Sequence, residues 1–348
     1  MMHALVDTAP ALLLFGPLAR EHVTFAQACH FILLYNCLAF GLQLPLGWLA
    51  DSFRAYKTAA CVGLIACAAA FVLPGWGRVA LVSVSIGNAL FHVGGGALVM
   101  ERSGGRATEM GIFVAPGAVG VLLGIWLSDT GTPAQAGVAL ALMACAIFLF
   151  VQRMPALANV PSRRVARCSA VAGVALLALV VVVRSLLGGA IAGAWRSSWT
   201  VTVLLGVAAV AGKVLGGVLA DRIGYRVVAV GALLATLLIV HFTSTSAPAG
   251  AGAICLVQMT MAVTLAAAYR CFPARPATVF GLFSAMLLVG ALPGLTGLAA
   301  ARIAMQMSAA LIGITAFVLL GGLGLCAKRH PEPAVTGQDP LFCVNEGR

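Results

Sequence analysis

The sequence predicts an all-α membrane protein, with twelve transmembrane helices arranged as two pseudo-symmetric bundles of six. Composition is the first reason: 61% of the 348 residues are hydrophobic and 9% are charged, whereas a soluble domain carries roughly 25% charged residues. Second, the apolar runs are continuous rather than alternating, which favours helices over a β-barrel. Third, a short charged junction occurs twice, half a chain apart, as expected of two similar halves.

The apolar runs divide into twelve predicted spans, each near the roughly 20 residues that a helix needs to cross a bilayer. Their limits are roughly 3–19, 24–50, 58–74, 79–100, 109–128, 135–152, 169–190, 198–220, 227–242, 250–269, 278–300 and 304–327. They group into an N-terminal bundle at 1–152 and a C-terminal bundle at 169–327. Between these, 153–168 holds two prolines and several arginines and is expected to be a cytoplasmic linker. The proline-containing segment 328–348 is expected to be a disordered cytoplasmic tail.

The positive charges support this alternation. With the N-terminus in the cytoplasm, fifteen of the 21 Lys and Arg residues fall in cytoplasmic segments, four fall on the other side and two lie within spans. Lys and Arg collect in cytoplasmic loops, so both termini are expected in the cytoplasm of a bacterial cell, with the chain a monomer in the inner membrane. The net charge of +11 is then a consequence of topology, and no nucleic-acid partner is expected.

The sequence predicts no enzyme, cofactor or metal site. The ten Cys are scattered singly, with no CxxC motif and no Cys–His cluster, which is typical of apolar packing residues rather than of a disulfide or zinc framework. No nucleophile–base pair is found, and no ATP-binding GxxxxGK[ST] loop is present.

The repeated junction closes an apolar run and opens a short charged turn. Its second copy runs from Gly216 to Arg226 and its first from Gly47 to Lys57, and Asp51 and Asp221 are 170 positions apart. A glycine there lets two helices approach closely, and an aspartate accepts hydrogen bonds from the N-terminus of a neighbouring helix. The arginines pair with acids and favour the cytoplasmic side. Such a contact, formed in one state and broken in another, is what a gate requires.

The second copy resembles the loop pattern Gly-x-Leu-Ala-Asp-Arg-x-Gly-x-Arg of the major facilitator superfamily of transporters. The first copy fits only through Asp51, because Ser52 stands in place of the Arg and Arg54 in place of the Gly, and whether it still gates is open. The resemblance implies two six-helix halves that rock about a central site. The gating residues expected from it are Gly47, Asp51, Gly217, Asp221, Arg222 and Arg226. A weaker resemblance, to the fosmidomycin-resistance branch of drug exporters, is carried by the segment Asn88–His92, by Arg184-Ser185 and by His3-x-x-x-Asp7.

Polar and ionisable groups inside the spans are the candidate site residues, because such groups are expensive at membrane depth. His3 and Asp7 are four residues apart, as are Asn88 and His92, so each pair shares one helical face. Spans one, four, seven and ten line the central cavity of the superfamily. The resemblance therefore implies a substrate site formed by Asp7, Asn88, His92, Arg184 and Gln258, with proton coupling at Asp7 and His3.

Other interpretations of these residues stay open. Asp7 would also suit the headgroup region, His92 could be a packing histidine, and Arg184 could extend to the outer surface. Lys213, in the middle of span eight, is interpreted as a structural charge, a partner to an acid. The glycine-rich spans five, eight and eleven are expected to form the interface between the two halves.

These observations predict a secondary active transporter that moves a small organic solute by alternating access, with proton-coupled efflux as the leading mode. The excess of basic groups at membrane depth favours an anionic or zwitterionic solute. Two alternatives remain: a proton-independent uniporter or importer of organic anions, and a non-transporting membrane sensor with this fold.

Overall fold

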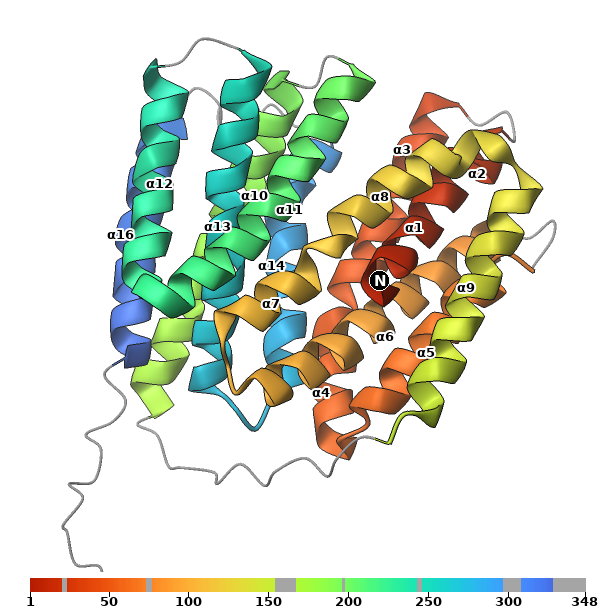
Figure 1. Cartoon of the computed structure of the whole chain (residues 1–348), viewed down its shortest axis with the longest axis horizontal. Helices are drawn as coiled ribbons and strands as arrows, with labels where there is room; N and C mark the ends of the chain where they lie inside the picture. The colour runs from red at the N-terminus through yellow and green to blue at the C-terminus, as the bar shows by residue number, and fades with distance from the viewer. Residues whose placement is uncertain are drawn as a thin grey trace, which may run out of the picture.

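The computed structural model describes residues 1–20, 24–72, 77–153, 167–195, 198–242, 246–296 and 308–327, which are predominantly helical and contain no β-strand (Figure 1). The helices of the first half are α1 (Met2–Phe15), α2 (Pro17–Arg20), α3 (Phe25–Asn36), the π-helical turn η1 (Cys37–Gly41), α4 (Gln43–Phe53), α5 (Tyr56–Ala69), α6 (Gly77–Ser103), α7 (Ala107–Val114), α8 (Pro116–Leu127), the short 3₁₀ turn η2 (Ser128–Thr130) and α9 (Thr132–Val151). Those of the second half are α10 (Arg167–Trp195), α11 (Trp199–Ile223), α12 (Tyr225–Phe242), α13 (Ala247–Cys271), α14 (Pro276–Leu295) and α16 (Ser308–Ala327). The predicted all-α class is confirmed.

Ten helical segments within the described residues are long and apolar enough to cross a membrane, and two further apolar helices, Tyr56–Ala69 and Ala310–Cys326, are shorter. The chain is a multi-pass membrane protein. The count of twelve crossings and the division into two bundles of six stay predictions. The predicted linker falls mostly, and the predicted tail 328–348 wholly, outside the described residues.

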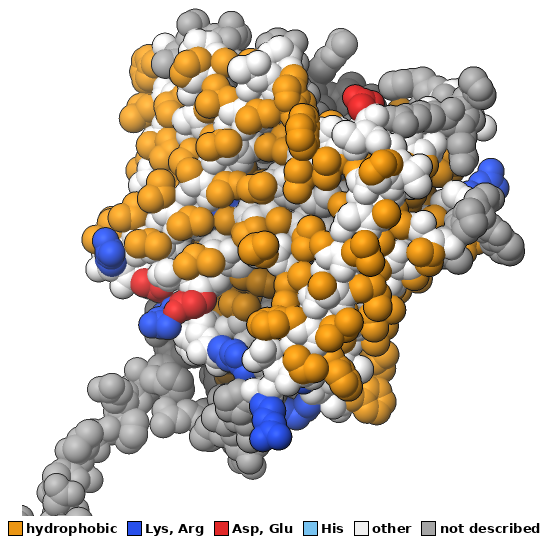
Figure 2. Space-filling model, turned by 45° about the vertical axis from the view of Figure 1, so that its right-hand side comes forward, with side chains coloured by type: hydrophobic (Ala, Val, Ile, Leu, Met, Phe, Trp, Pro, Cys, Tyr) orange, Lys and Arg blue, Asp and Glu red, His pale blue; other side chains and the backbone are white. Residues whose placement is uncertain are grey.

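The outer surface is suited to lipid rather than to water. In Figure 2 apolar side chains cover most of the face shown, and most of the charged side chains lie toward its lower end. Trp126, Leu140, Phe150 and Phe317 have between 62% and 79% of their surface exposed. An apolar surface this broad would be an aggregation hazard in water but costs nothing against hydrocarbon.

Helices of each half pack mainly with one another, and two crossings form the largest contacts between the halves, beside smaller contacts of α14 with α6, α13 with α7 and α11 with α8. Figure 1 shows most helices of the first half on the right and α10–α13 with α16 on the left, with α7 and α14 in the middle. In the first half, α5 packs against α6 and α9, and α1 packs against α8; in the second, α13 packs against α10, α11 and α12. The halves meet where α4 crosses α14 and where α7 crosses α11. One buried apolar core fills the first half, and a larger one fills the second and continues into α7 through Met110.

The fifth predicted span is broken in the middle. α7 ends at Val114 and α8 begins at Pro116, because proline has no N–H to donate and its ring clashes with the preceding turn. The break turns two carbonyl oxygens toward side chains. Phe113 O contacts His3 Nδ1, and Val114 O accepts a hydrogen bond from Lys213 Nζ at 3.2 Å. A sequence-local proline thus creates polar acceptors in the interior.

The glycines of spans five, eight and eleven pack only partly as predicted. Some do lie between the halves: a Cβ at Gly111 would overlap the Lys213 carbonyl, and one at Gly281 would overlap the Gln43 carbonyl. Others pack within one half, as Gly120 does against Ala4 of α1. The expectation that these spans form the interface therefore holds for part of their glycines, because each span divides its small residues between an internal neighbour and the opposite half.

Candidate functional site

Four polar side chains from two helices meet inside the first half. His3 and Asp7 come from α1, and Asn88 and His92 come from α6. Asn88 Nδ2 donates to Asp7 Oδ1 at 2.8 Å, His3 Nε2 lies 3.2 Å from Asp7 Oδ2, and His92 Nε2 lies 3.7 Å from Asp7 Oδ1. Both histidines and Asn88 are buried, and the Asp7 side chain is 14% exposed. The structure brings together two pairs that are more than 80 residues apart in sequence, and we call this set the His–Asp cluster.

The two histidine rings face each other through their Nε2 atoms, which are 2.9 Å apart. Each Nδ1 lies against a carbonyl oxygen, that of Phe113 for His3 and that of Asn88 for His92. Because a carbonyl can only accept, each Nδ1 must carry a hydrogen. A hydrogen bond between the two Nε2 atoms then requires one further proton between them, next to the Asp7 carboxylate. The His–Asp cluster can therefore hold one proton, or another cation in its place.

Gly117, the second residue of α8, gives the cluster its room. A Cβ at this position would overlap Asp7 Oδ2 and would lie 2.8 Å from His3 Nε2. The break at Pro116 places this glycine directly against α1. Both features come from the dipeptide Pro116-Gly117, so the local sequence of span five shapes a site whose functional groups lie on other helices.

Aromatic rings surround the His–Asp cluster. The ring centroid of Phe113 lies 4.9 Å from that of His3, and Phe280, which belongs to α14 of the second half, lies 6.3 Å from that of His92 and 5.9 Å from that of Phe113. His3 and Phe113 also line a cavity of about 600 Å³. The cluster is thus shielded by apolar rings, one of which is supplied from across the interface.

Arg184 lies in the second half and is 4% exposed. Its Nη1 reaches the hydroxyls of Thr260 and Thr264 on α13 at 3.5 and 3.4 Å. Both hydroxyls already donate to carbonyl oxygens of their own helix, and within the described residues no carboxylate forms an ion pair with Arg184. Sequence reasoning missed both threonines, although they lie near the predicted Gln258 on one helix.

The remaining predicted interior residues lie apart from this cluster. Gln258, on α13, is half-buried and takes part in no side-chain hydrogen bond within the described parts of the chain. Lys213 donates to the Val114 carbonyl, so its hydrogen-bond partner is a backbone oxygen rather than the predicted acid, because the broken helix offers that oxygen. The five predicted substrate residues therefore form two groups, with Asp7, Asn88 and His92 in one half and Arg184 and Gln258 in the other.

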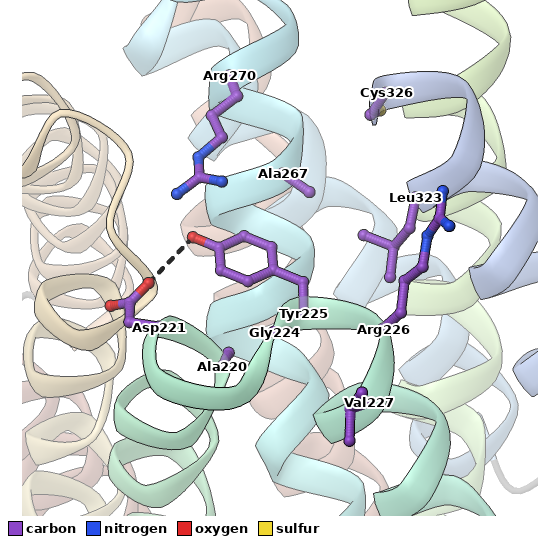
Figure 3. Close-up of a pocket in the computed structure, with 10 residues that line it drawn as sticks. All are labelled: Ala220, Asp221, Gly224, Tyr225, Arg226, Val227, Ala267, Arg270, Leu323 and Cys326. Atoms are coloured by element: carbon purple, nitrogen blue, oxygen red, sulfur yellow. Dashed lines mark hydrogen bonds between the residues drawn. The ribbon is translucent and has the colours of Figure 1, made fainter. Parts of the chain in front are cut away.

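Asp221, at the end of α11, binds the first residues of α7 across the interface between the halves. Its carboxylate accepts hydrogen bonds from Ala107 N at 3.0 Å, from Thr108 N at 2.7 Å and from the Thr108 hydroxyl at 2.7 Å. Tyr225 OH lies 3.3 Å from the same carboxylate (Figure 3). A carboxylate at a helix N-terminus is favourable because it satisfies N–H groups that have no partner within the helix.

Asp51, at the end of α4, forms the equivalent contact with the first residues of α14. It accepts from Ala277 N at 3.0 Å, from Thr278 N at 2.7 Å and from the Thr278 hydroxyl at 2.5 Å, and Tyr56 OH donates to it at 2.9 Å. The donor segments Ala107-Thr108 and Ala277-Thr278 are 170 positions apart, as are the two aspartates. Sequence analysis missed these donor segments, although a search for further matches at this spacing would have found them.

Gly47 and Gly217 make both contacts possible. A Cβ at Gly47 would overlap the Ala277 carbonyl, and one at Gly217 would overlap the Ala107 carbonyl. The two loops both have a positive φ at the corresponding residue but differ in ψ: Arg54 has φ 49° and ψ 35°, and Gly224 has φ 100° and ψ 144°. The departures of the first loop from the pattern therefore leave the Asp51 contact intact.

The arginines of the second loop do not support the contact in the predicted way. Arg222 and Arg226 are exposed, and neither forms an ion pair within the described residues. In Figure 3 Arg226 extends toward Leu323, away from Asp221. Arg270, on α13, lies beside the Asp221 contact instead. Its Nε donates to the Gly105 carbonyl at 3.1 Å, and its guanidinium lies 4.5 Å from the ring centre of Tyr225.

Comparison with known proteins extends these observations. No family model matches the sequence, and no curated protein matches it. Among solved structures, a variant of the E. coli fucose:proton symporter FucP is similar with a TM-score of 0.63 at 15% identity, covering 94% of this chain and 95% of that one. FucP in the outward conformation, a major facilitator superfamily transporter, gives 0.60 at 14% identity, covering 94% and 97%. A bacterial homologue of the iron transporter ferroportin in its outward-facing state gives 0.54 at 13% identity, again covering 94% and 97%.

Identities this low establish a shared fold and nothing finer. The chain shares the fold of these solved structures over nearly its whole length. The similarity to the fosmidomycin-resistance branch stays a prediction. The chain has the fold of major facilitator superfamily transporters.

Proposed function

We propose that the chain is a secondary active transporter which moves a small organic anion or zwitterion across a bacterial inner membrane by alternating access. It acts as a monomer of two six-helix bundles with both termini in the cytoplasm. The observation that carries this proposal is the duplicated contact in which Asp51 and Asp221 each bind a helix N-terminus of the opposite half. Two equivalent contacts that hold the halves together at one end are suited to form and break as a pair.

The direction of opening follows from the proposed topology. In this topology both contacts would lie at the cytoplasmic end, so the conformation described here would be closed to the cytoplasm. Breaking the Asp51 and Asp221 contacts would let the halves separate at that end. Gly47 and Gly217 would let the helices approach again, since a side chain at either position would hold them apart.

The solute class is inferred from Arg184. A buried guanidinium offers five N–H donors, yet its side-chain partners are two distant hydroxyls. Burying a charge without a counter-charge is unfavourable, so a bound anion would complete this site. Gln258 on the adjacent helix and Asn88 on the other half would add neutral polar contacts to the same solute.

The coupling ion is inferred from the His–Asp cluster. A proton shared by His3 and His92 would lie next to Asp7, in a site lined by apolar rings. A solute anion bound near such a site would interact with that proton, and exchange of one for the other would couple their movements. We place proton coupling at Asp7 and His3, with export of the solute as the favoured direction.

The test is transport in proteoliposomes that contain a pH-sensitive dye, with solutes first selected from organic anions by thermal shift of the purified chain. The parent should move protons in exchange for the solute, and Asp7→Asn should lose the proton signal. Asp129→Asn, a matched change of an exposed aspartate, should behave as the parent. If Asp7→Asn moves solute and protons as well as the parent, Asp7 is not the coupling residue. Solute movement without protons would indicate the uniporter alternative, and no movement of any solute would indicate a sensor.

A further inference from the structure

We propose that the His–Asp cluster is a binding site for a divalent transition-metal ion such as Zn²⁺, Co²⁺ or Fe²⁺. His3, Asp7 and His92 each offer one ligating atom, and within the described residues these atoms all lie within 4.8 Å of one another. Two imidazole nitrogens and one carboxylate oxygen are a ligand set that such ions bind in proteins. Because the ligands come from α1 and α6, the set exists only in the folded chain.

The separations between the ligating atoms fit a metal ion. Ligands bound tetrahedrally at about 2.0–2.1 Å lie about 3.3 Å from one another. The observed separations are 2.9 Å between the two Nε2 atoms, 3.2 Å from His3 Nε2 to Asp7 Oδ2, and 3.7 Å from His92 Nε2 to Asp7 Oδ1. The two separations to Asp7 involve different carboxylate oxygens, so the carboxylate would turn to offer one oxygen to an ion placed between it and the two imidazoles.

The surroundings orient the histidines as metal ligands usually are. Metal-binding histidines commonly donate their second ring N–H to a carbonyl or a carboxylate, which fixes the ring and directs the other nitrogen at the metal. Here His3 Nδ1 lies against Phe113 O and His92 Nδ1 against Asn88 O. Both Nε2 atoms are thereby directed at the same point, beside the Asp7 carboxylate.

Asn88 carries a further oxygen beside the cluster. Asn88 Oδ1 is buried and has no hydrogen-bond partner within the described residues, while the Nδ2 of the same amide contacts Asp7. The absence of a side chain at Gly117 lets Asp7 Oδ2 and His3 Nε2 pack closely against α8. Imidazole nitrogen suits transition metals, whereas Mg²⁺ and Ca²⁺ prefer all-oxygen sites, so the ligand set selects the first group.

The ion would occupy the position of the proton shared by the two histidines, so proton and metal would exclude each other. Binding of the ion needs only the folded cluster and does not depend on transport of an organic anion. A chain that binds the ion but moves no solute leaves this inference standing, and a chain that moves solute but binds no ion leaves the proposed function standing.

The experiment uses the full chain purified in detergent without a histidine tag. Co²⁺ is added while the visible absorption is recorded, and the affinity for Zn²⁺ is measured by competition with a chelating dye. We expect one ion per chain, no competition from Mg²⁺ or Ca²⁺, and at least about tenfold weaker binding in His92→Ala and Asp7→Asn. His241→Ala, at an exposed histidine outside the cluster, should bind as the parent. Parent-like binding in both cluster variants would overturn the proposal.

A measurement on the unaltered chain keeps the test decisive if the variants fail to fold. X-ray absorption of the Zn²⁺-loaded parent should show a first shell of nitrogen and oxygen, with the outer-shell pattern of two imidazoles. A first shell containing sulfur, or one without imidazole, would place the ion elsewhere and overturn the proposal, as would the absence of any stoichiometric binding.

Discussion

Arg54 is the one residue other than glycine with a positive φ in the described part of the chain. A left-handed conformation costs a residue with a Cβ roughly 1–2 kcal/mol, and the equivalent position of the second loop is Gly224. Arg54 also lies 3.5 Å from Glu101, with its side chain about half exposed. Replacing Arg54 therefore changes two contributions to the free energy of unfolding at once, the backbone strain and the ion pair with Glu101.

Comparing two variants of Arg54 isolates the backbone term. Arg54→Ala and Arg54→Gly both remove the ion pair with Glu101, but only the glycine relieves the left-handed strain. We expect Arg54→Gly to unfold at a higher temperature than Arg54→Ala, with a difference of about 1 kcal/mol in the free energy of unfolding. Thermal unfolding in detergent measures this. Equal stability of the two variants would show that the loop relaxes to another conformation.

The His–Asp cluster shows which contacts between residues could be predicted from the sequence and which could not. The pairs His3–Asp7 and Asn88–His92 could be predicted because a spacing of four places both members on one helical face. The contact between His3 and His92 could not, because it depends on how α1 packs against α6. The partners of Arg184 were missed for a similar reason, since threonines in an apolar helix carry no signal that distinguishes them from packing residues.

The helices themselves follow from hydropathy, and their interruptions follow from local chemistry. Continuous apolar runs gave the spans, and Pro116 is a visible reason for the break between α7 and α8. The π-helical turn η1 inside the second span was not predicted, although Pro45 lies four residues after its last residue, Gly41, and has no N–H to donate to the Gly41 carbonyl. Which helix a glycine face packs against was also not predictable, since small residues permit close approach without specifying the partner.

Substitutions at two glycines, one on α8 and one on α9, distinguish the effect of close helix packing on stability from the effect of helix propensity. A Cβ at Gly120 of α8 would overlap the Ala4 carbonyl of α1, whereas one at Gly137 of α9 would meet nothing within 4 Å. We expect Gly120→Ala to lower the unfolding temperature, by an amount that corresponds to about 1–3 kcal/mol from overpacking. Gly137→Ala should raise it slightly, because alanine favours helix by about 0.5–1 kcal/mol over glycine. Similar effects of the two substitutions on thermal unfolding would contradict the close α1–α8 contact.

At the scale of the whole molecule, the halves are related by repeated contacts rather than by repeated interior residues. Asp51 and Asp221, and the segments that they bind, recur at a spacing of 170. The interior groups differ, with the His–Asp cluster in one half and Arg184 in the other. The repeat was visible in the sequence because contacts between equivalent halves constrain both copies alike. The interior could be predicted only as a list of polar candidates, because the two halves contribute different chemistry.

If the halves move as rigid units, weakening either aspartate contact should open both. Asp51→Asn and Asp221→Asn each keep one acceptor but lose the charge, and hydrogen bonds to charged groups contribute about 1.5–3 kcal/mol. We expect each variant to shift the equilibrium toward the state open to the cytoplasm by about tenfold or more.

The measurement is the distance between spin labels at the exposed positions of Arg106→Cys and Arg222→Cys, beside the Asp221 contact, in a chain without native cysteines. Asp51→Asn should lengthen this distance although it acts at the other contact, and Asp129→Asn should leave it unchanged. A response to Asp221→Asn alone would mean that the two contacts open independently, which rigid halves do not permit.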